Sequence, residues 1–122
     1  MSDPAAALQA LLDAKPGAVG ALLPSAKGVL LYKVMGKMFA ILALRGDPSV
    51  ILKCDPHLVE ILKEQYLGVG HRSHLDRRFW ICVTLDSDVP ADEVERLVDG
   101  SYDLVRAGLT RKQRAELEGR PA

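Results

Sequence analysis

The stretch "VLLYKVMGKMFAILALRGDPSVILKC", residues 29–54, decides the fold. Its two longer apolar runs flank Gly36, which readily takes the positive φ that a tight hairpin turn requires. The segment "RGDPS" (45–49) predicts a second turn, because Gly, Asp and Pro each favour turns. Connections this short join antiparallel neighbours. We therefore expect three consecutive antiparallel strands, over residues 29–35, 38–45 and 50–54.

Helical patterns surround these strands. Asp55 and Pro56 suit the cap and first turn of one helix, and Thr110 with Gln113 has the spacing of a capping box. The expected elements are helices over residues 2–14, 56–66 and 90–107, a short C-terminal helix from Thr110, a strand over residues 79–85, a short strand near residues 71–73, and a loop over residues 18–28.

These elements predict one α+β domain, residues 1–122, built of two layers. An antiparallel sheet of about five strands is covered on one face by helices, in the order α-β-β-β-α-β-β-α, followed by the short C-terminal helix. The core is expected to hold Leu8, Leu12, Leu31, Phe39, Ile41, Val50, Leu52, Leu58, Leu62, Trp80, Cys82, Leu97, Val98, Tyr102 and Val105.

The composition is ordinary for a soluble protein, with 48% hydrophobic and 26% charged residues. No apolar run approaches the roughly 20 residues that a membrane helix needs. The N-terminus lacks the basic region and long apolar segment of a signal peptide, and two cysteines are too few for a disulfide scaffold. We therefore expect a cytoplasmic protein without a membrane segment.

The charges cancel in total but are unevenly spread. Sixteen basic residues balance sixteen acidic ones, whereas proteins that bind nucleic acid through phosphates usually carry a positive excess. Residues 27–53 hold five basic groups against one acid, and residues 106–114 hold four basic groups and no acid. Residues 86–103 hold seven acids against Arg96. The neutral total can therefore conceal two basic faces and an acidic one, or reflect only mixed solvated faces.

The stretch "GHRSHLDRRFWICVTL", residues 70–85, gathers two histidines, three arginines and the single tryptophan. Neither Cys54-x2-His57 nor His71-x2-His74 supplies the four ligands of a structural zinc site. No glycine-flanked nucleophile elbow or phosphate-binding loop occurs. We therefore expect no metal site, no cofactor and no catalytic residue, and the function expected is binding and not catalysis.

Four segments in this order resemble the MmcQ/YjbR family of small bacterial proteins. They are "LLYKVMGKMFAIL", "LKCDPHLVEILKEQY", "HLDRRFW" and "SYDLVRAGLTRKQRAEL", which together span about three quarters of the chain. The resemblance implies a helix, three strands, a helix, two strands and a helix, similar to secretion-chaperone-like and frataxin-like sheets. The family usually has His-Trp-Asn where this chain has Phe79-Trp80-Ile81.

The resemblance also implies DNA binding, because the family is often described as DNA-binding. On this hypothesis, basic side chains on a hairpin and a turn contact phosphates without reading sequence. The candidate residues are Lys33, Lys37, Arg72, His74, Arg77 and Arg78. The alternative is a protein-interaction or adaptor module without nucleic-acid or catalytic activity, in which the acidic helix over residues 90–106 faces a basic partner.

Overall fold

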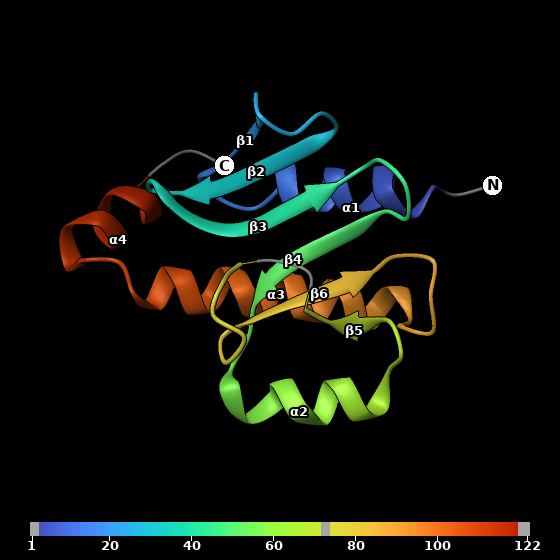
Figure 1. Cartoon of the computed structure of the whole chain (residues 1–122). Coiled ribbons are helices and arrows are strands. Elements are labelled where there is room, and N and C mark those ends of the chain that lie inside the picture. Colours follow the sequence, from blue (N-terminus) through green and yellow to red (C-terminus); the bar gives the residue numbers. More distant parts are fainter. Residues whose placement is uncertain (1–2, 72–73, 120–122) are drawn as a thin grey trace.

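Within the described residues the sheet has six strands, each antiparallel to its neighbours, in the order β1-β2-β3-β4-β6-β5 (Figure 1). The computed structural model describes residues 3–71 and 74–119. Its strands are β1 (Ala18–Leu22), β2 (Val29–Val34), β3 (Lys37–Ala43), β4 (Ser49–Lys53), β5 (Val69–Gly70) and β6 (Trp80–Thr84). Its helices are α1 (Pro4–Asp13), α2 (Pro56–Gln65), α3 (Ala91–Ala107) and α4 (Arg111–Glu118). None of these four helices is both long and apolar enough to cross a membrane.

The β2–β3 hairpin closes through a turn whose two central residues both have positive φ. Met35 has φ 50° and Gly36 has φ 80°, the combination of a type I′ turn, whose twist matches that of the flanking strands. A Cβ at Gly36 would meet no atom within 4 Å, so the turn needs glycine for its backbone conformation and not for space. This confirms the hairpin predicted around Gly36.

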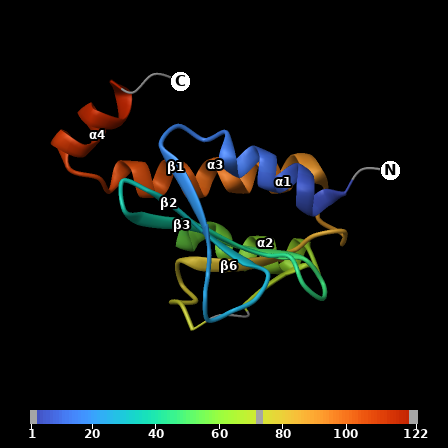
Figure 2. The same cartoon turned by 90° about the horizontal axis from the view of Figure 1, so that it is seen from above.

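Helices cover one face of the sheet and one of its edges. Figure 2 shows α1 and α3 side by side on one face, and Figure 1 shows α2 along the β5 edge. The residues of β2 alternate accordingly, because Tyr32 and Val34 are buried under the helices while Lys33 between them is exposed. The α+β class and the antiparallel sheet are confirmed; α2, however, lies at an edge and not on the helical face.

A buried hydroxyl joins the helical layer to the centre of the sheet. Ser101 of α3 is fully buried, and its Oγ donates to the carbonyl of Phe39 at 2.6 Å and accepts from the N–H of Lys53 at 2.8 Å. The β3–β4 pairing ends at Ala40 and Leu52, which are the chain neighbours of Phe39 and Lys53. The side chain of Ser101 therefore bridges the two strands where their direct pairing stops.

Three aromatic rings form the centre of the core beside Ser101. The rings of Tyr32 and Tyr102 each meet Phe39 edge to face, at centroid distances of 6.2 and 5.5 Å. Both tyrosine hydroxyls reach the end of α1: the Tyr32 hydroxyl donates to Asp13 at 2.8 Å, and the Tyr102 hydroxyl donates to the carbonyl of Pro16 at 2.6 Å. Burial and the neighbouring Asp13 carboxylate raise the pKa of Tyr32, so its hydroxyl remains a donor at neutral pH.

Two predictions of local structure were wrong. The expected loop over residues 18–28 contains β1, which pairs with β2 along its whole length. Small residues and Gly20 give "AVGAL" little strand propensity of its own, so pairing with β2 stabilises the strand. The short strand expected near residues 71–73 lies at Val69–Gly70 instead, and Arg72 and Ser73 lie outside the described residues.

Most of the expected core is buried, but five of its residues are not. Leu58 is 47% exposed on the outer side of α2. Leu31 and Ile41 alternate with the buried positions of their strands and are only half-buried on the helix-free face, and Trp80 is half-buried at the start of β6. Leu97 is half-buried and packs against the core from α3. The predicted burial of this strand on both faces is confirmed at the centre of β6, where the consecutive residues Ile81, Cys82 and Val83 are all buried, but not at its ends.

The bridge made by Ser101 predicts a large stability loss in Ser101→Ala. The substitution leaves the N–H of Lys53 and the carbonyl of Phe39 without their partner in the core, which should lower the free energy of unfolding by about 2–4 kcal/mol. Urea denaturation followed by circular dichroism measures this change. Ser25→Ala, at an exposed loop position, should have almost no effect. A loss at Ser101 no greater than the loss at Ser25 would contradict the bridging role.

Candidate nucleic-acid interface

The segment between β5 and β6 is organised by Asp76. Its Oδ1 accepts from the N–H of Arg78 at 3.0 Å, and its carbonyl accepts from the N–H groups of Phe79 and Trp80 at 3.1 and 3.0 Å. The carbonyl of Phe79 in turn accepts from the N–H of Cys54 at 2.7 Å. A carboxylate that accepts from a backbone N–H two residues later forms an Asx turn. Residues 76–79 are thus a tight turn fixed to the end of β4.

The side chain of Arg78 pairs with Asp76 within this turn. Its Nε and Nη2 donate to the two carboxylate oxygens of Asp76 at 3.1 and 2.8 Å, a bidentate pair. Its guanidinium also lies 5.2 Å from the ring centroid of Phe79. The side-chain hydrogen bonds from Arg78 and its backbone N–H lower the pKa of Asp76 to about 2. Asp76 is therefore ionised at neutral pH and offsets the charge of Arg78.

A basic pocket of about 490 Å³ lies between this turn and α2. Lys63 comes from α2, His71 follows β5, and Arg77 and Arg78 come from the turn. Its other lining residues are Pro56, Val59, Glu60 and Phe79. We call this set the basic pocket. Nδ1 of His71 lies 3.1 Å from the carbonyl of Trp80, and because a carbonyl only accepts, the proton is on Nδ1.

The cationic side chains of the basic pocket differ in whether they form an ion pair with a neighbouring carboxylate. Lys63 contacts Glu60 at 3.5 Å, and both groups are partly exposed, so this pair contributes little. Arg77 is exposed and forms no ion pair with any other described residue. The guanidinium of Arg77 therefore lines the pocket without an ion-pair partner among the described residues.

The remaining candidate residues do not line the basic pocket. Lys33 is exposed on the helix-free face of β2, and His74 is exposed just before the turn. Lys37 begins β3 and its Nζ donates to the carbonyl of Gly108 at 3.2 Å, where cations stabilise the C-terminus of α3. Figure 2 shows the β2–β3 hairpin turning toward α3, whereas the segment before β6 projects from the opposite side. Arg72 lies outside the described residues.

Two members of the pocket, Lys63 and His71, were not among the candidates from the sequence. Lys63 stands in a helix with an ordinary charge pattern, and it meets the turn only because α2 runs along the β5 edge. His71 was considered as half of a metal motif. Among residues 3–71 and 74–119 no three His, Cys, Asp or Glu side chains gather as metal ligands.

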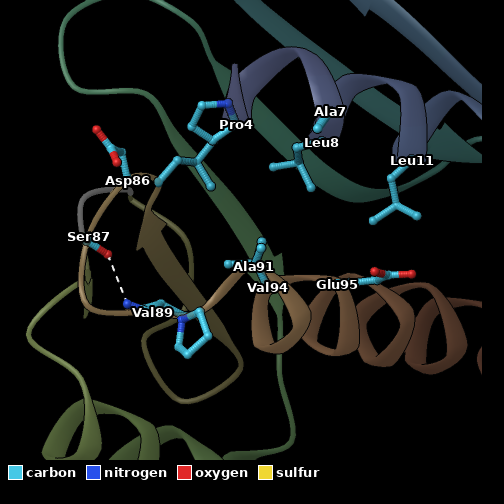
Figure 3. Close-up of a pocket in the computed structure, with 12 residues that line it drawn as sticks. Pro4, Ala7, Leu8, Leu11, Asp86, Ser87, Val89, Ala91, Val94 and Glu95 are labelled. Carbon is cyan, nitrogen blue, oxygen red and sulfur yellow. Dashed lines mark hydrogen bonds between the residues drawn. The ribbon is translucent and has the colours of Figure 1, made fainter. Parts of the chain in front are cut away.

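A second hollow, of about 550 Å³, lies between α1 and the start of α3 (Figure 3). Its floor is apolar and is formed largely by Leu8, Leu11, Leu85, Val89 and Val94. Asp86 and Glu95 stand at its rim. Neither rim carboxylate forms an ion pair with another described residue, whereas Asp92 and Glu93 both contact Arg96. We call this hollow the α1–α3 groove.

A family model described as YjbR matches residues 13–104 of the chain. The chain belongs to the YjbR family. The matched span includes the whole sheet, Ser101 and every residue of the basic pocket. The YjbR match ends before α4, and it begins at the last residue of α1.

Relatives within the YjbR family are themselves uncharacterised. The chain is 36% identical over 90 residues to the Escherichia coli protein named uncharacterized protein YjbR, covering 73% of this chain and 75% of that protein. It is 28% identical over 82 residues to uncharacterized protein YbdF of Escherichia coli O157:H7, covering 66% and 67%.

Solved structures share the fold. A crystal structure of the Deinococcus radiodurans protein DR2400, described as a DUF419 domain, is similar with a TM-score of 0.83 and 32% identity over 99% of this chain and 94% of that one. A Pseudomonas syringae protein of known crystal structure has a TM-score of 0.66 and 22% identity over 79% of this chain and 96% of its own; this likeness concerns the fold alone.

The environment of Cys54 predicts an unreactive thiol. Cys54 is buried, and its burial, with the nearby Asp55 carboxylate, raises the pKa of the thiol to about 11. Since the thiolate is the reactive form, native protein should react with a thiol reagent at pH 8 far more slowly than protein unfolded in guanidinium. Mass spectrometry after alkylation measures the rate at each cysteine. Rapid labelling of Cys54 in the native state would contradict this placement.

Proposed function

We propose that this chain binds nucleic acid through its phosphate backbone, at the basic pocket. The observation that carries the proposal is the meeting of Lys63, His71, Arg77 and Arg78, from three separate segments, around one hollow. Because Arg77 is unengaged by other described residues, its planar guanidinium is available for a bidentate contact with a phosphate. The role proposed is binding without catalysis.

The chemistry of the pocket favours backbone contact over sequence readout. Cationic side chains fix a phosphate without distinguishing bases. The Phe79 ring in the wall provides an apolar surface for a sugar. Attraction of this kind can operate although the net charge of the chain is zero, because it depends on local charge and weakens as salt rises. We therefore propose non-specific binding with a strong salt dependence.

The test is fluorescence anisotropy with a labelled duplex of about 20 base pairs at low salt. Arg77→Ala should weaken binding about fivefold or more, since one phosphate contact is lost. Lys112→Ala removes the same charge from an exposed position on α4 and should leave the affinity nearly unchanged. No binding at micromolar protein, or equal losses in the two variants, would refute the proposal.

Asp76→Asn should change the duplex affinity in the opposite direction in the same assay. The asparagine oxygen can still accept from the backbone N–H of Arg78, which preserves the turn, while the carboxylate charge that engages the Arg78 guanidinium is removed. Duplex affinity should therefore rise by a few-fold. A decrease in affinity with an intact circular dichroism spectrum would contradict the view that Asp76 offsets the charge of Arg78 at the binding surface.

A protein-interaction function is the second candidate, and the α1–α3 groove is the observation that favours it. An apolar floor with Asp86 and Glu95 at its rim is complementary to an amphipathic segment that carries lysine or arginine. This partner class agrees with the acidic helix considered from the sequence. The groove and the basic pocket share no lining residue, so the two candidate functions can be separated by mutation.

The discriminating variant is Glu95→Lys. Titration of the protein with a basic amphipathic helical peptide, followed by NMR, should show shifts at Leu11 and Val94 that Glu95→Lys abolishes. The same variant should keep its affinity for the duplex. If peptide binding survives Glu95→Lys, or if no shifts occur at the groove, the second candidate is wrong.

A further inference from the structure

The two edges of the sheet differ in how well they are protected from pairing with another strand. At one edge β5 is only two residues long and α2 runs beside it (Figure 1). At the other edge β1 is the terminal strand, five residues long, with the sequence "AVGAL" and no charge or proline. Val19 and Leu22 are 63% and 68% exposed. Natural proteins usually protect such an edge with charges, prolines or bulges, so β1 is an unprotected template for strand pairing.

The hydrogen-bond pattern shows which groups of β1 point outward. The N–H of Leu23 donates to the carbonyl of Val29 at 2.8 Å, which places Leu23 in a hydrogen-bonded pair with β2. Hydrogen-bonded and non-hydrogen-bonded pairs alternate along an antiparallel ladder. The N–H and carbonyl groups of Val19 and Ala21 therefore also point toward β2, whereas those of Gly20 and Leu22 point away from the sheet. Ala18 faces outward too, but its N–H donates to the carbonyl of Lys15 at 3.0 Å.

We propose that β1 pairs with β1 of a second copy of this chain, antiparallel, about a two-fold axis at Ala21. In this register Gly20 of one copy lies opposite Leu22 of the other, and each such pair exchanges two hydrogen bonds. All the free outward donors of β1 are then used. A register centred on Gly20 would place Leu22 opposite Ala18, whose N–H is already engaged. Beyond Leu22, Pro24 has no N–H to donate.

The side chains of β1 fit the same register. Leu22 of one copy lies opposite Gly20 of the other, on the helical face. There the Tyr32 ring packs directly against Gly20, since a Cβ at Gly20 would lie 2.6 Å from that ring, so Leu22 of the second copy meets a position without a side chain of its own. On the opposite face Val19 pairs with Leu23 of the second copy, and the two Ala21 residues meet at the axis, where small side chains permit close approach.

Charge argues for a second copy as the occupant. Two identical chains of zero net charge do not repel one another at long range, and β1 itself places no like charges opposite each other. The helices α1 and α3 lie on one face of the sheet and not beyond its β1 edge (Figure 2). The pairing therefore extends the six-stranded sheet across the axis into a continuous sheet of both copies.

The first test is the mass of the full chain in solution, by analytical ultracentrifugation from about 10 µM to about 500 µM, because a short strand interface gives a concentration-dependent dimer. Wild type should shift from monomer to dimer. Ala21→Lys places two lysines face to face at the axis and should remain monomeric, whereas Leu67→Lys, at a 97% exposed position far from β1, should dimerise. A monomeric wild type throughout, or a dimeric Ala21→Lys, would overturn the proposal.

The second test reports the register. Ala21→Cys brings two thiols to a non-hydrogen-bonded pair with Cα atoms about 4.5 Å apart, within reach of a disulfide. Mild oxidation should cross-link this variant quantitatively. Val19→Cys lies opposite Leu23, about 13 Å from its own copy along the strand, and should stay uncrosslinked. Equal cross-linking of both variants would indicate random collision and refute the register.

Discussion

The hydroxyl of Ser101 is the interaction on which the rest of the structure depends. It replaces the direct pairing between β3 and β4 where the two strands separate, and it links both to α3. Beyond this point the β2–β3 hairpin turns toward α3 (Figure 2), while β4 continues toward α2 (Figure 1). Cys54, next to the bonded Lys53, then anchors the 76–79 turn through the carbonyl of Phe79. The Ser101 bridge is thus one residue away from the strand end to which the wall of the basic pocket is fixed.

Because β3 and β4 separate at this point, the basic residues of this chain lie in different places and have different roles. Lys37, on the hairpin, caps the C-terminus of α3, and Arg78 holds the turn through Asp76. Arg77 is one residue from Arg78 yet has no such structural partner in the described part of the chain. A count of positive charges therefore says little about binding here, because each cation has to be considered together with the groups that already engage it.

Local features of the fold could be predicted from the sequence, and non-local ones could not. Gly36 specified the hairpin and the Thr110–Gln113 capping box specified the start of α4, because each signal lies within a few residues. Strand β1 depends on pairing with β2, and Lys63 reaches the pocket through the placement of α2. The half-buried position of Trp80 was missed because its strand is almost entirely apolar, so the pattern does not show where burial ends along it.

The proposal of phosphate binding at the basic pocket is tested most directly by NMR mapping of the wild-type chain with an unlabelled DNA duplex at low salt. The proposal predicts that amide shifts concentrate on residues 57–63 of α2, on His71 and on residues 74–79, and that they fade as salt is added. Shifts confined to the α1–α3 groove or to the helix-free face of the sheet, or no shifts at millimolar duplex, would contradict it.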